Sequence, residues 1–391
     1  MNFYIVYLLI PTVLFIIRPL KNNKLLVFYW AAICILSYDN VTDYYFYYDE
    51  FFSLYAKDTT IYEQKGREWG WVNLFSLLTF TKYGIVLMHT IVLSLIVYQY
   101  HKYSKKLGIL NISILLYFIC NLVWKHDNIW RQDIAIFFAY IAFFKVIESE
   151  NIDKKLLSQL LLLTVCAFLF HASAILLIPI YFFIRWIAKV QFRFIIIFPI
   201  VISVTFLFST QGINSFLNLF TLFFSAYDSN TSAYYLNYLS SDIENSMTKF
   251  SLVWTALSTV PLFYYNYINK ESYKNNKYLR LCVNLSWIVI TWRTCFTQDL
   301  LKRPTDYLLW FQVWAYAFVL KDMFFEKKKQ VSTILLGLLF FTAIYIQEFK
   351  FIQSYYGENN YLTIFSHECE QLRIYKRSFV LGEEKNFKRI R

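Results

Sequence analysis

Apolar residues occur along this chain in long runs, and short charged segments separate one run from the next. The runs lie at 2–17, 25–38, 83–100, 107–124, 134–147, 156–170, 173–187, 194–209, 250–268, 281–297, 305–320 and 331–347. A helix that crosses a bilayer needs about 20 predominantly apolar residues, and its ends are polar. The pattern predicts an all-α, polytopic integral membrane protein with about twelve transmembrane helices in one domain, 1–391. A shorter apolar segment, 70–80, is expected at the membrane interface.

The composition agrees with a membrane protein and excludes other classes. Of 391 residues, 58% are hydrophobic, 21% aromatic and only 16% charged, whereas soluble domains average roughly 45–50% apolar and about 25% charged residues. Eight glycines and six prolines exclude collagen, low-complexity linkers and most glycine-rich nucleotide loops. Six cysteines without CxxC or Cys/His spacing support neither a disulfide framework nor a metal site.

The basic residues predict an orientation. The net charge is +12, and Lys and Arg gather between the apolar runs at 18–24, 102–106 and 327–329. Positively charged loops stay in the cytoplasm, so we expect membrane lipids rather than nucleic acid as the partner of this charge. The N-terminus and the long loops 39–69 and 210–249 are then outside, and the side of the tail 348–391 is left open.

The outer segment 39–69 is rich in Tyr and carries seven carboxylates against three basic residues. One interpretation is a solvated loop with a belt of interfacial tyrosines. The other is a carbohydrate-binding surface, because aromatic faces pack against sugar C–H groups and carboxylates accept hydroxyl hydrogen bonds.

Three further positions place ionisable groups beside apolar runs. Arg131 opens a predicted helix on the outer side, where it is suited either to bind a phosphate or to reach lipid head groups. His171 lies within an apolar run, so it is either a packing residue or a functional one. Arg293 and Arg303 form an outward cationic group that requires an anionic ligand or internal pairing to Asp299 and Asp306. His89, in contrast, lies within a run without polar neighbours in sequence and is interpreted as a helix–helix contact.

The order of these motifs resembles a known family over nearly the whole chain. The motifs are Asp43, Tyr44 and Tyr47 in the outer segment, Glu68-x-Gly70-Trp71, Ile129-Trp130-Arg131-Gln132-x-Ile134-Ala135, Phe170-His171-x-Ser173-Ala174, Arg303-x-x-x-Tyr307 and Asn360-Tyr361-x-x-Ile364-Phe365. Together they resemble the EpsG family of Wzy-type polysaccharide polymerases. The chain departs from the family pattern in having two candidates, Asp39 and Asp43, for one acidic position, and in a longer tail.

The resemblance implies a GT-C-like or Wzy-like helical bundle in the bacterial inner membrane. Such an enzyme joins undecaprenyl-diphosphate-linked oligosaccharide repeat units on the outer face, for O-antigen, capsule or exopolysaccharide, by inverting glycosyl transfer. It uses no cofactor, nucleotide sugar or metal, and a chain-length regulator protein is a candidate partner. The residues that match the implied roles are Arg131, Arg293 and Arg303 for the diphosphate, His171, Asp43 or Glu68 for the general base, and Tyr44, Tyr47, Trp71, Gln132, Tyr307 and Tyr361 for the glycans.

Three alternatives remain open from the sequence. A repeat-unit flippase is disfavoured because internal repeats and Gly/Pro-interrupted helices, which are common in transporters, are not visible. A membrane O-acyltransferase would also use a buried His, but its accompanying motif is missing. A glycosyltransferase or chain ligase that uses the same lipid donor is poorly separated from a polymerase by sequence.

Overall fold

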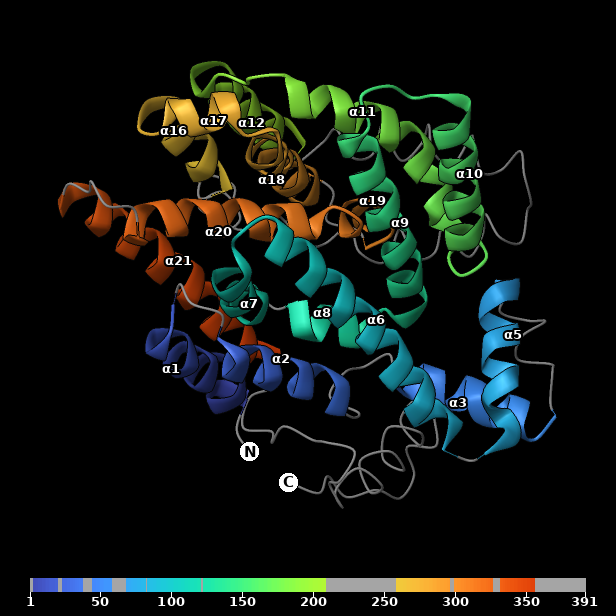
Figure 1. Ribbon diagram of the computed structural model, residues 1–391. Coiled ribbons are helices and arrows are strands. Elements are labelled where there is room, and N and C mark those ends of the chain that lie inside the picture. The colour runs from blue at the N-terminus through green and yellow to red at the C-terminus, as the bar shows by residue number, and fades with distance from the viewer. Residues whose placement is uncertain are drawn as a thin grey trace. The chain divides into compact units, whose positions relative to one another are not determined.

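The computed structural model describes residues 3–19, 23–37, 44–57, 68–81, 83–120, 122–208, 258–295, 299–325 and 331–355. Every secondary-structure element formed by these residues is a helix (Figure 1), which confirms the all-α prediction. The chain divides into two compact units. The first unit comprises Met1–Lys145, Asn151–Leu177 and Met323–Arg391, and the second comprises Val146–Glu150 and Ile178–Asp322.

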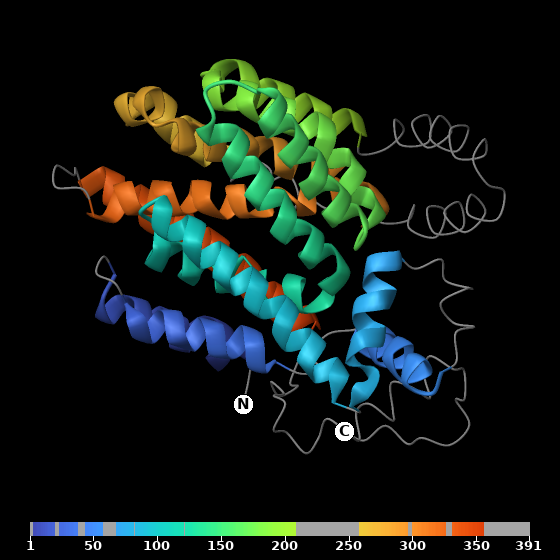
Figure 2. The ribbon, with the colours of Figure 1, turned by 45° about the vertical axis from the view of Figure 1, so that its right-hand side comes forward.

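The first unit contains most of the N-terminal helices. They are η1 (Ile5–Leu9), α1 (Ile10–Ile17), α2 (Lys24–Leu36), α3 (Tyr44–Tyr55), α5 (Trp69–Leu77), η2 (Leu78–Phe80), α6 (Gly84–Lys106), α7 (Leu110–Ile119), α8 (Leu122–Asn128), most of α9 (Trp130–Glu148), α10 (Lys154–Phe168), η3 (Ala172–Leu176) and α21 (Val331–Tyr355). Helix α6 packs against α2, and α3 packs against α5 and α6 (Figures 1 and 2).

Side chains fix the start of two of these helices. The Oδ1 atom of Asn23 accepts a hydrogen bond from the backbone N–H of Leu26 at 3.1 Å, while its Nδ2 donates to the carbonyl of Leu14 at 2.6 Å. Asp153 caps α10 by accepting from the N–H of Leu156 at 2.7 Å. Such caps satisfy N–H groups that have no partner within the helix, and the Asn23 cap also ties the start of α2 to α1.

Helix α3 lies inside the segment predicted as an outer loop. Tyr47 and Phe51, one turn apart, are both buried against Trp71, Phe75 and Met88. Residues four apart lie on the same face of a helix, so this face of α3 joins the apolar core of the first unit. The short aromatic stripe explains why a segment with many carboxylates still forms a packed helix.

A break in the chain separates α10 from η3 within the long apolar stretch 156–187. His171 adopts an extended backbone with φ −154° and ψ 115°. The carbonyl of Ala167 accepts hydrogen bonds from the N–H groups of both Phe170 and His171, at 3.1 and 2.9 Å. The helix therefore closes tightly at Phe170 and begins again after His171, which confirms that this run forms two helices.

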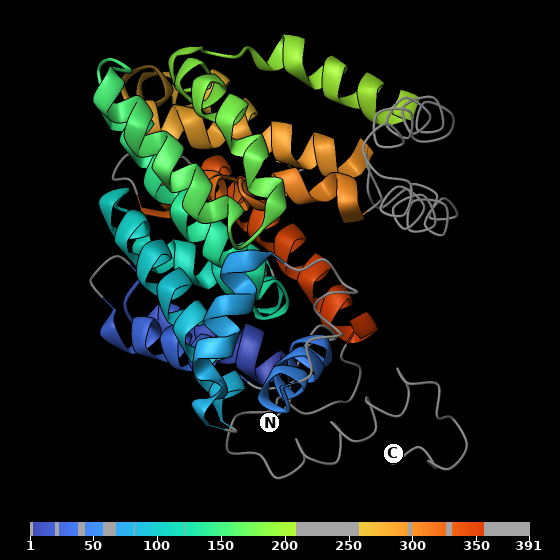
Figure 3. The ribbon, with the colours of Figure 1, turned by 90° about the vertical axis from the view of Figure 1, so that its right-hand side faces the viewer.

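The second unit contains α11 (Leu177–Lys189), α12 (Phe194–Phe208), α16 (Val260–Tyr267), α17 (Lys270–Asn275), α18 (Lys277–Cys295), α19 (Asp299–Asp306) and most of α20 (Leu309–Phe325). Helix α12, yellow-green in Figure 3, packs against α18. Buried Asn284 of α18 donates to the carbonyls of Ile187 and Val190 at 2.7 and 2.9 Å. It thereby satisfies carbonyls at the end of α11 that have no helical partner.

Each of the twelve predicted apolar runs contains helix in its described part. Among the described residues, two helical stretches, Gly84–Lys106 and Ala172–Lys189, are long and apolar enough to cross a membrane, and several shorter apolar helices accompany them. The number of twelve crossings therefore stays a prediction.

Candidate functional site

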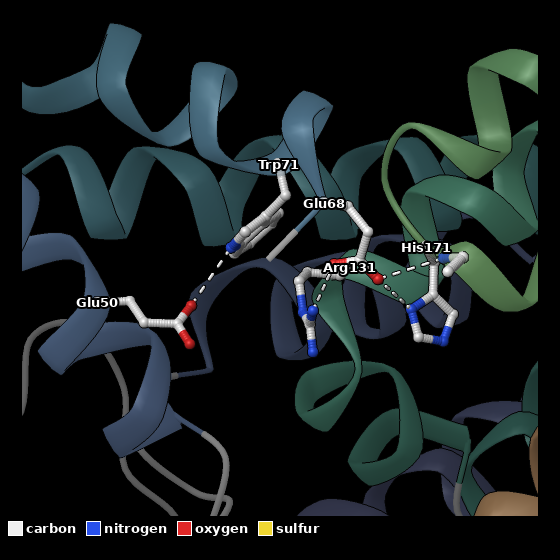
Figure 4. A network of polar contacts seen from close by, with 6 residues as sticks. Glu50, Glu68, Trp71, Arg131 and His171 are labelled. Atoms are coloured by element: carbon white, nitrogen blue, oxygen red, sulfur yellow. Dashed lines mark hydrogen bonds and ion pairs between the residues drawn. The ribbon is translucent and has the colours of Figure 1, made fainter. Parts of the chain in front are cut away.

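The carboxylate of Glu68 connects three parts of the first unit. Its Oε2 accepts a hydrogen bond from Nη1 of Arg131 at 2.6 Å. Its Oε1 lies 3.2 Å from Nδ1 of His171 and accepts from the backbone N–H of Ala172, also at 3.2 Å. Figure 4 shows the Arg131 and His171 side chains converging on Glu68. The structure therefore brings together three residues that are 63 and 103 positions apart along the chain.

A close backbone contact places Glu68 next to His171. The N–H of Gly70, in the first turn of α5, donates to the carbonyl of Leu169 at 2.8 Å. A Cβ atom at position 70 would lie 2.6 Å from that carbonyl oxygen, closer than atoms of this kind can approach. The glycine of the Glu68-x-Gly70-Trp71 motif thus allows α5 to meet the turn between α10 and η3.

Arg131 lies in the first turn of α9, as its sequence position predicted. Its Nη1 binds Glu68, and its Nε is buried without a hydrogen-bond partner among the described residues. Just before α9, Nδ1 of His126 lies 2.5 Å from Oδ1 of Asp133, and both side chains are buried. This pair joins α8 to the first turn of α9 and so restrains the backbone that carries Arg131.

Aromatic rings pack together at the start of α9, which carries Arg131. Tyr47 stacks on Trp130 with ring centroids 4.5 Å apart and an interplanar angle of 11°, and it lies 5.4 Å from Trp71. The indole N–H of Trp71 donates to Oε2 of the buried Glu50 at 3.4 Å. The rings of Tyr47, Trp71 and Trp130 are packed in the core, so they shape the site and do not offer open faces to a glycan in this structure.

The cluster holds Glu68 as an anion. Burial alone would raise the pKa of this carboxyl, but the hydrogen bond with His171 and the charges of Arg131 and His171 outweigh burial and lower the pKa from 4.5 to about 2. For Arg131, burial favours the neutral form, whereas Tyr47, Glu68 and Glu50 act in the opposite direction and raise its pKa. Both groups therefore carry their charges at neutral pH.

The contact with Glu68 also selects a form of the imidazole. A carboxylate with a pKa of about 2 accepts hydrogen bonds and does not donate them, so Nδ1 of His171 carries the proton in this contact. In the neutral ring the lone pair that can accept a second proton is then on Nε2. A carboxylate–imidazole pair of this kind fixes the tautomer and orientation of the ring.

The second unit contains the other predicted cationic group. Nη1 of Arg293 lies 3.2 Å from Oδ1 of buried Asp306, which is the internal pairing considered from sequence. Arg303 is half-buried near the end of α19, and Tyr307 is buried directly after it. Arg293 is thus already paired with a carboxylate.

The remaining predicted site residues lie outside the cluster or outside the described residues. Gln132 follows Arg131 and is buried. Asp43 and Tyr361 lie outside the described residues, as does the side chain of Tyr44, whose backbone begins α3. His89, expected to lack polar neighbours, is 3.2 Å from the Ser37 hydroxyl, so it does make the predicted helix–helix contact but through a polar partner.

Sequence reasoning missed Glu50 and the His126–Asp133 pair. Glu50 follows Tyr47 by three residues, so both lie on the same face of α3. That spacing would have placed Glu50 beside Tyr47 if 44–55 had been predicted as a helix. Among the described residues, no group of three or more His, Cys, Asp or Glu side chains is arranged to hold a metal ion. Independence of metal remains a prediction from the family resemblance.

Comparison with known proteins supports the family that the sequence motifs predicted. A family model described as the EpsG family matches residues 23–363, which is most of the chain. No curated protein and no solved structure matches the chain.

Proposed function

We propose that this chain, which belongs to the EpsG family, polymerises undecaprenyl-diphosphate-linked oligosaccharide repeat units on the outer face of the bacterial inner membrane. EpsG family members are Wzy-type polymerases, and the family fits polysaccharide synthesis at a membrane. The observation that carries the proposal is the contact of Glu68 with both Arg131 and His171, because these are a cation, a carboxylate and an imidazole from separate family motifs.

In this proposal Arg131 binds the diphosphate of the donor. Glu68 occupies Nη1 only, and the buried Nε has no partner among the described residues. A guanidinium can donate from two edges, which matches the spacing of phosphate oxygens. As the bond to the sugar breaks, the diphosphate gains negative charge, and a cation already in place stabilises that charge. Diphosphate contacts by Arg293 and Arg303, which lie in the second unit, stay predictions from the family resemblance.

His171 is proposed as the general base. The acceptor hydroxyl forms a bond to the anomeric carbon of the donor sugar while its proton passes to Nε2 of His171. The bond from that carbon to the diphosphate oxygen breaks, and undecaprenyl diphosphate leaves with the electron pair. Glu68 orients the imidazole and stabilises its cationic form. A carboxyl with a pKa of about 2 is itself a weak base, so Asp43 is the more suitable carboxylate alternative.

Glycan contacts by Tyr44, Tyr47, Trp71, Gln132, Tyr307 and Tyr361 remain predictions. The four of them whose side chains are described, Tyr47, Trp71, Gln132 and Tyr307, are buried. We therefore expect Tyr47 and Trp71 to support Arg131, and an arriving glycan to meet less buried groups such as Trp69, which is 70% exposed beside Glu68.

The proposal is tested with the purified protein, reconstituted in membranes with lipid-linked repeat units. Wild type should give a ladder of polymer, and transfer of only a single unit would indicate a ligase instead. Arg131→Ala should abolish the ladder, and Arg131→Lys should recover little of it, because a point charge does not reproduce the planar guanidinium. Exposed Arg193 supplies the matched control, and Arg193→Ala should retain the ladder. A wild-type ladder from Arg131→Ala would contradict the proposed role.

A further inference from the structure

The end of helix α11 is held by side chains from α18. The carbonyls of Ile187 and Val190 accept hydrogen bonds from Nδ2 of Asn284 at 2.7 and 2.9 Å. The carbonyl of Ala188 accepts from Nε of Arg280 at 2.6 Å. Carbonyls in the last turn of a helix lack helical partners, and basic side chains of the same turn often bond to them. Here α18 supplies those bonds, so the basic residues of α11 are not needed to cap it.

The turn that follows α11 is fixed as well. The N–H of Phe192 donates to the hydroxyl of Tyr273 at 3.1 Å, and its carbonyl accepts from Nδ2 of Asn266, also at 3.1 Å. The N–H of Phe194, at the start of α12, donates to Oδ1 of Asn266 at 3.2 Å. The backbone of the turn is therefore bonded to α16 and α17, which gives the end of α11 a defined position.

Two basic residues at this end of α11 have no acidic partner. Arg185 is half-buried and Lys189 is exposed, and their spacing of four residues places both on one face of the helix. Neither side chain forms an ion pair or a hydrogen bond with any residue that the structure describes. The sequence contains no Asp or Glu from 154 to 227. Two positive charges therefore lie together on this face, and α11 and α12 supply no carboxylate to neutralise them.

Apolar residues continue the same face away from the turn. Phe182 and Trp186 are 52% and 54% exposed. They precede Arg185 and Lys189 by three residues each, so they share the face of the two cations. Trp186 also contacts the ring of Phe192, with centroids 5.9 Å apart and an interplanar angle of 76°. Since a helix rises about 1.5 Å per residue, the face changes from cationic to apolar over about 10 Å, as a lipid does from its phosphate to its acyl chains.

We propose that this face of α11, formed by Phe182, Arg185, Trp186 and Lys189, binds a phospholipid with a negatively charged head group. The two cations contact the phosphate, and the guanidinium can donate from two edges, while the acyl chains lie along the two rings. The turn is one of the basic loops expected in the cytoplasm, and basic sites at that end of membrane helices bind anionic head groups. The site lies in the second unit and uses none of the residues proposed for polymerisation.

The test counts the lipids bound to the purified full chain in detergent by native mass spectrometry. Phosphatidylglycerol and phosphatidylcholine with the same acyl chains differ in net charge, and wild type should prefer phosphatidylglycerol. Arg185→Gln/Lys189→Gln should bind the first phosphatidylglycerol roughly ten-fold or more weakly than wild type and lose the preference. Lys154→Gln/Lys155→Gln is the matched control, because it removes two exposed positive charges at the start of α10, and it should keep the preference.

A second pair of measurements tests the apolar half of the face. Phe182→Ala should bind both lipids several-fold more weakly, because apolar area that the acyl chains would cover is lost, and should still prefer phosphatidylglycerol. Glycerol 3-phosphate, which carries the phosphate without acyl chains, should not displace the bound lipid at millimolar concentration. Displacement at that concentration would show a site for free phosphate and overturn the lipid assignment.

Three other outcomes would also overturn the proposal: equal retention of both lipids by wild type, a preserved preference in Arg185→Gln/Lys189→Gln, or an equal loss in the matched control. The unfolding temperature of each variant without added lipid shows whether it is folded, and the double variant should match wild type because neither cation holds the turn. Should the double variant unfold, Lys189→Gln alone removes an exposed charge and must still weaken the preference.

Discussion

Glu68 should make the stability of the protein depend on pH. Its pKa is lowered from 4.5 to about 2 in the folded protein, so the ionised carboxyl stabilises the fold at pH values above 4.5. That contribution, on the order of 3 kcal/mol, is lost as the pH falls from about 4.5 toward 2. Glu68→Gln should therefore unfold at a lower temperature than wild type at pH 7, and the difference should shrink between pH 5 and 3. If the unfolding temperatures of wild type and Glu68→Gln differed by the same amount at pH 7 and at pH 3, the contribution of an ionised Glu68 would be contradicted.

His171 can be tested as a base by comparing two replacements. Loss of a general base typically costs about 10²–10⁴-fold in rate. His171→Ala should leave single repeat units and little ladder, and His171→Gln should not rescue, because an amide cannot accept a proton at neutral pH. Donor binding should persist in both variants. If His171→Gln turned over at near the wild-type rate, His171 would be a positioning residue, and Asp43→Asn would become the variant to examine.

At the level of single residues, the sequence predicted the members of the cluster but not their contacts. Arg131 was recognisable as a cation that opens a predicted helix, His171 as an ionisable group within an apolar run, and Glu68 through its family motif in the acidic outer segment. That Glu68 binds both others depends on the backbone contact of Gly70 with Leu169, which involves segments far apart in the chain. The same limit applies to Glu50, whose effect on Arg131 appears only when α3 packs against the other helices.

At the level of the helices, the approach of α5 to the end of α10 should be sensitive to one methyl group. Gly70→Ala would place Cβ 2.6 Å from the Leu169 carbonyl oxygen, and backbone cannot move aside cheaply there. We expect Gly70→Ala to displace Glu68 from His171, lower the unfolding temperature and abolish polymer. Gly337→Ala is the milder comparison, because its Cβ would lie 3.0 Å from Cβ of Met323, a contact that a shift of a few tenths of an ångström relieves. Equal, mild effects in both variants would show that the contact is not needed.

The helix boundaries were predictable where polarity changes and unpredictable where packing decides. Apolar runs separated by charged residues correctly located helices such as α6 and α21. The extended residue His171 and the junction between α8 and α9 at Ile129 interrupt helices without any Gly or Pro. The first break is stabilised by a long-range contact with the Glu68 carboxylate, and the second by the His126–Asp133 pair, seven residues apart. The apolar runs predicted the division near His171, but they did not show that Glu68 stabilises it.

At the level of the whole molecule, the membership in the EpsG family and the apolar helices agree with a membrane protein, and the sidedness is a prediction from the basic loops. The site can only receive a donor from the outer leaflet if Glu68 and Arg131 face outward. The outer loop that precedes Glu68 and the helix α17, which lies in the predicted cytoplasmic loop between the runs 250–268 and 281–297, are therefore expected on opposite sides.

Introduced cysteines should locate both sides. Asn73 on α5 and Asn275 at the end of α17 are exposed, so each should react with thiol probes once the probe reaches it. A membrane-impermeant reagent applied to intact cells should label Asn73→Cys, as well as a cysteine at Asn230, which lies outside the described residues. It should label Asn275→Cys only after the membrane is opened. Wild type supplies the background from the six native cysteines. Cys34 and Cys282 are buried and Cys120 and Cys166 are partly covered, while the side chains of Cys295 and Cys369 lie outside the described residues. Labelling of Asn275→Cys alone in intact cells would invert the orientation and place Glu68, Arg131 and His171 on the cytoplasmic side, where the proposed acceptor chain would not reach them.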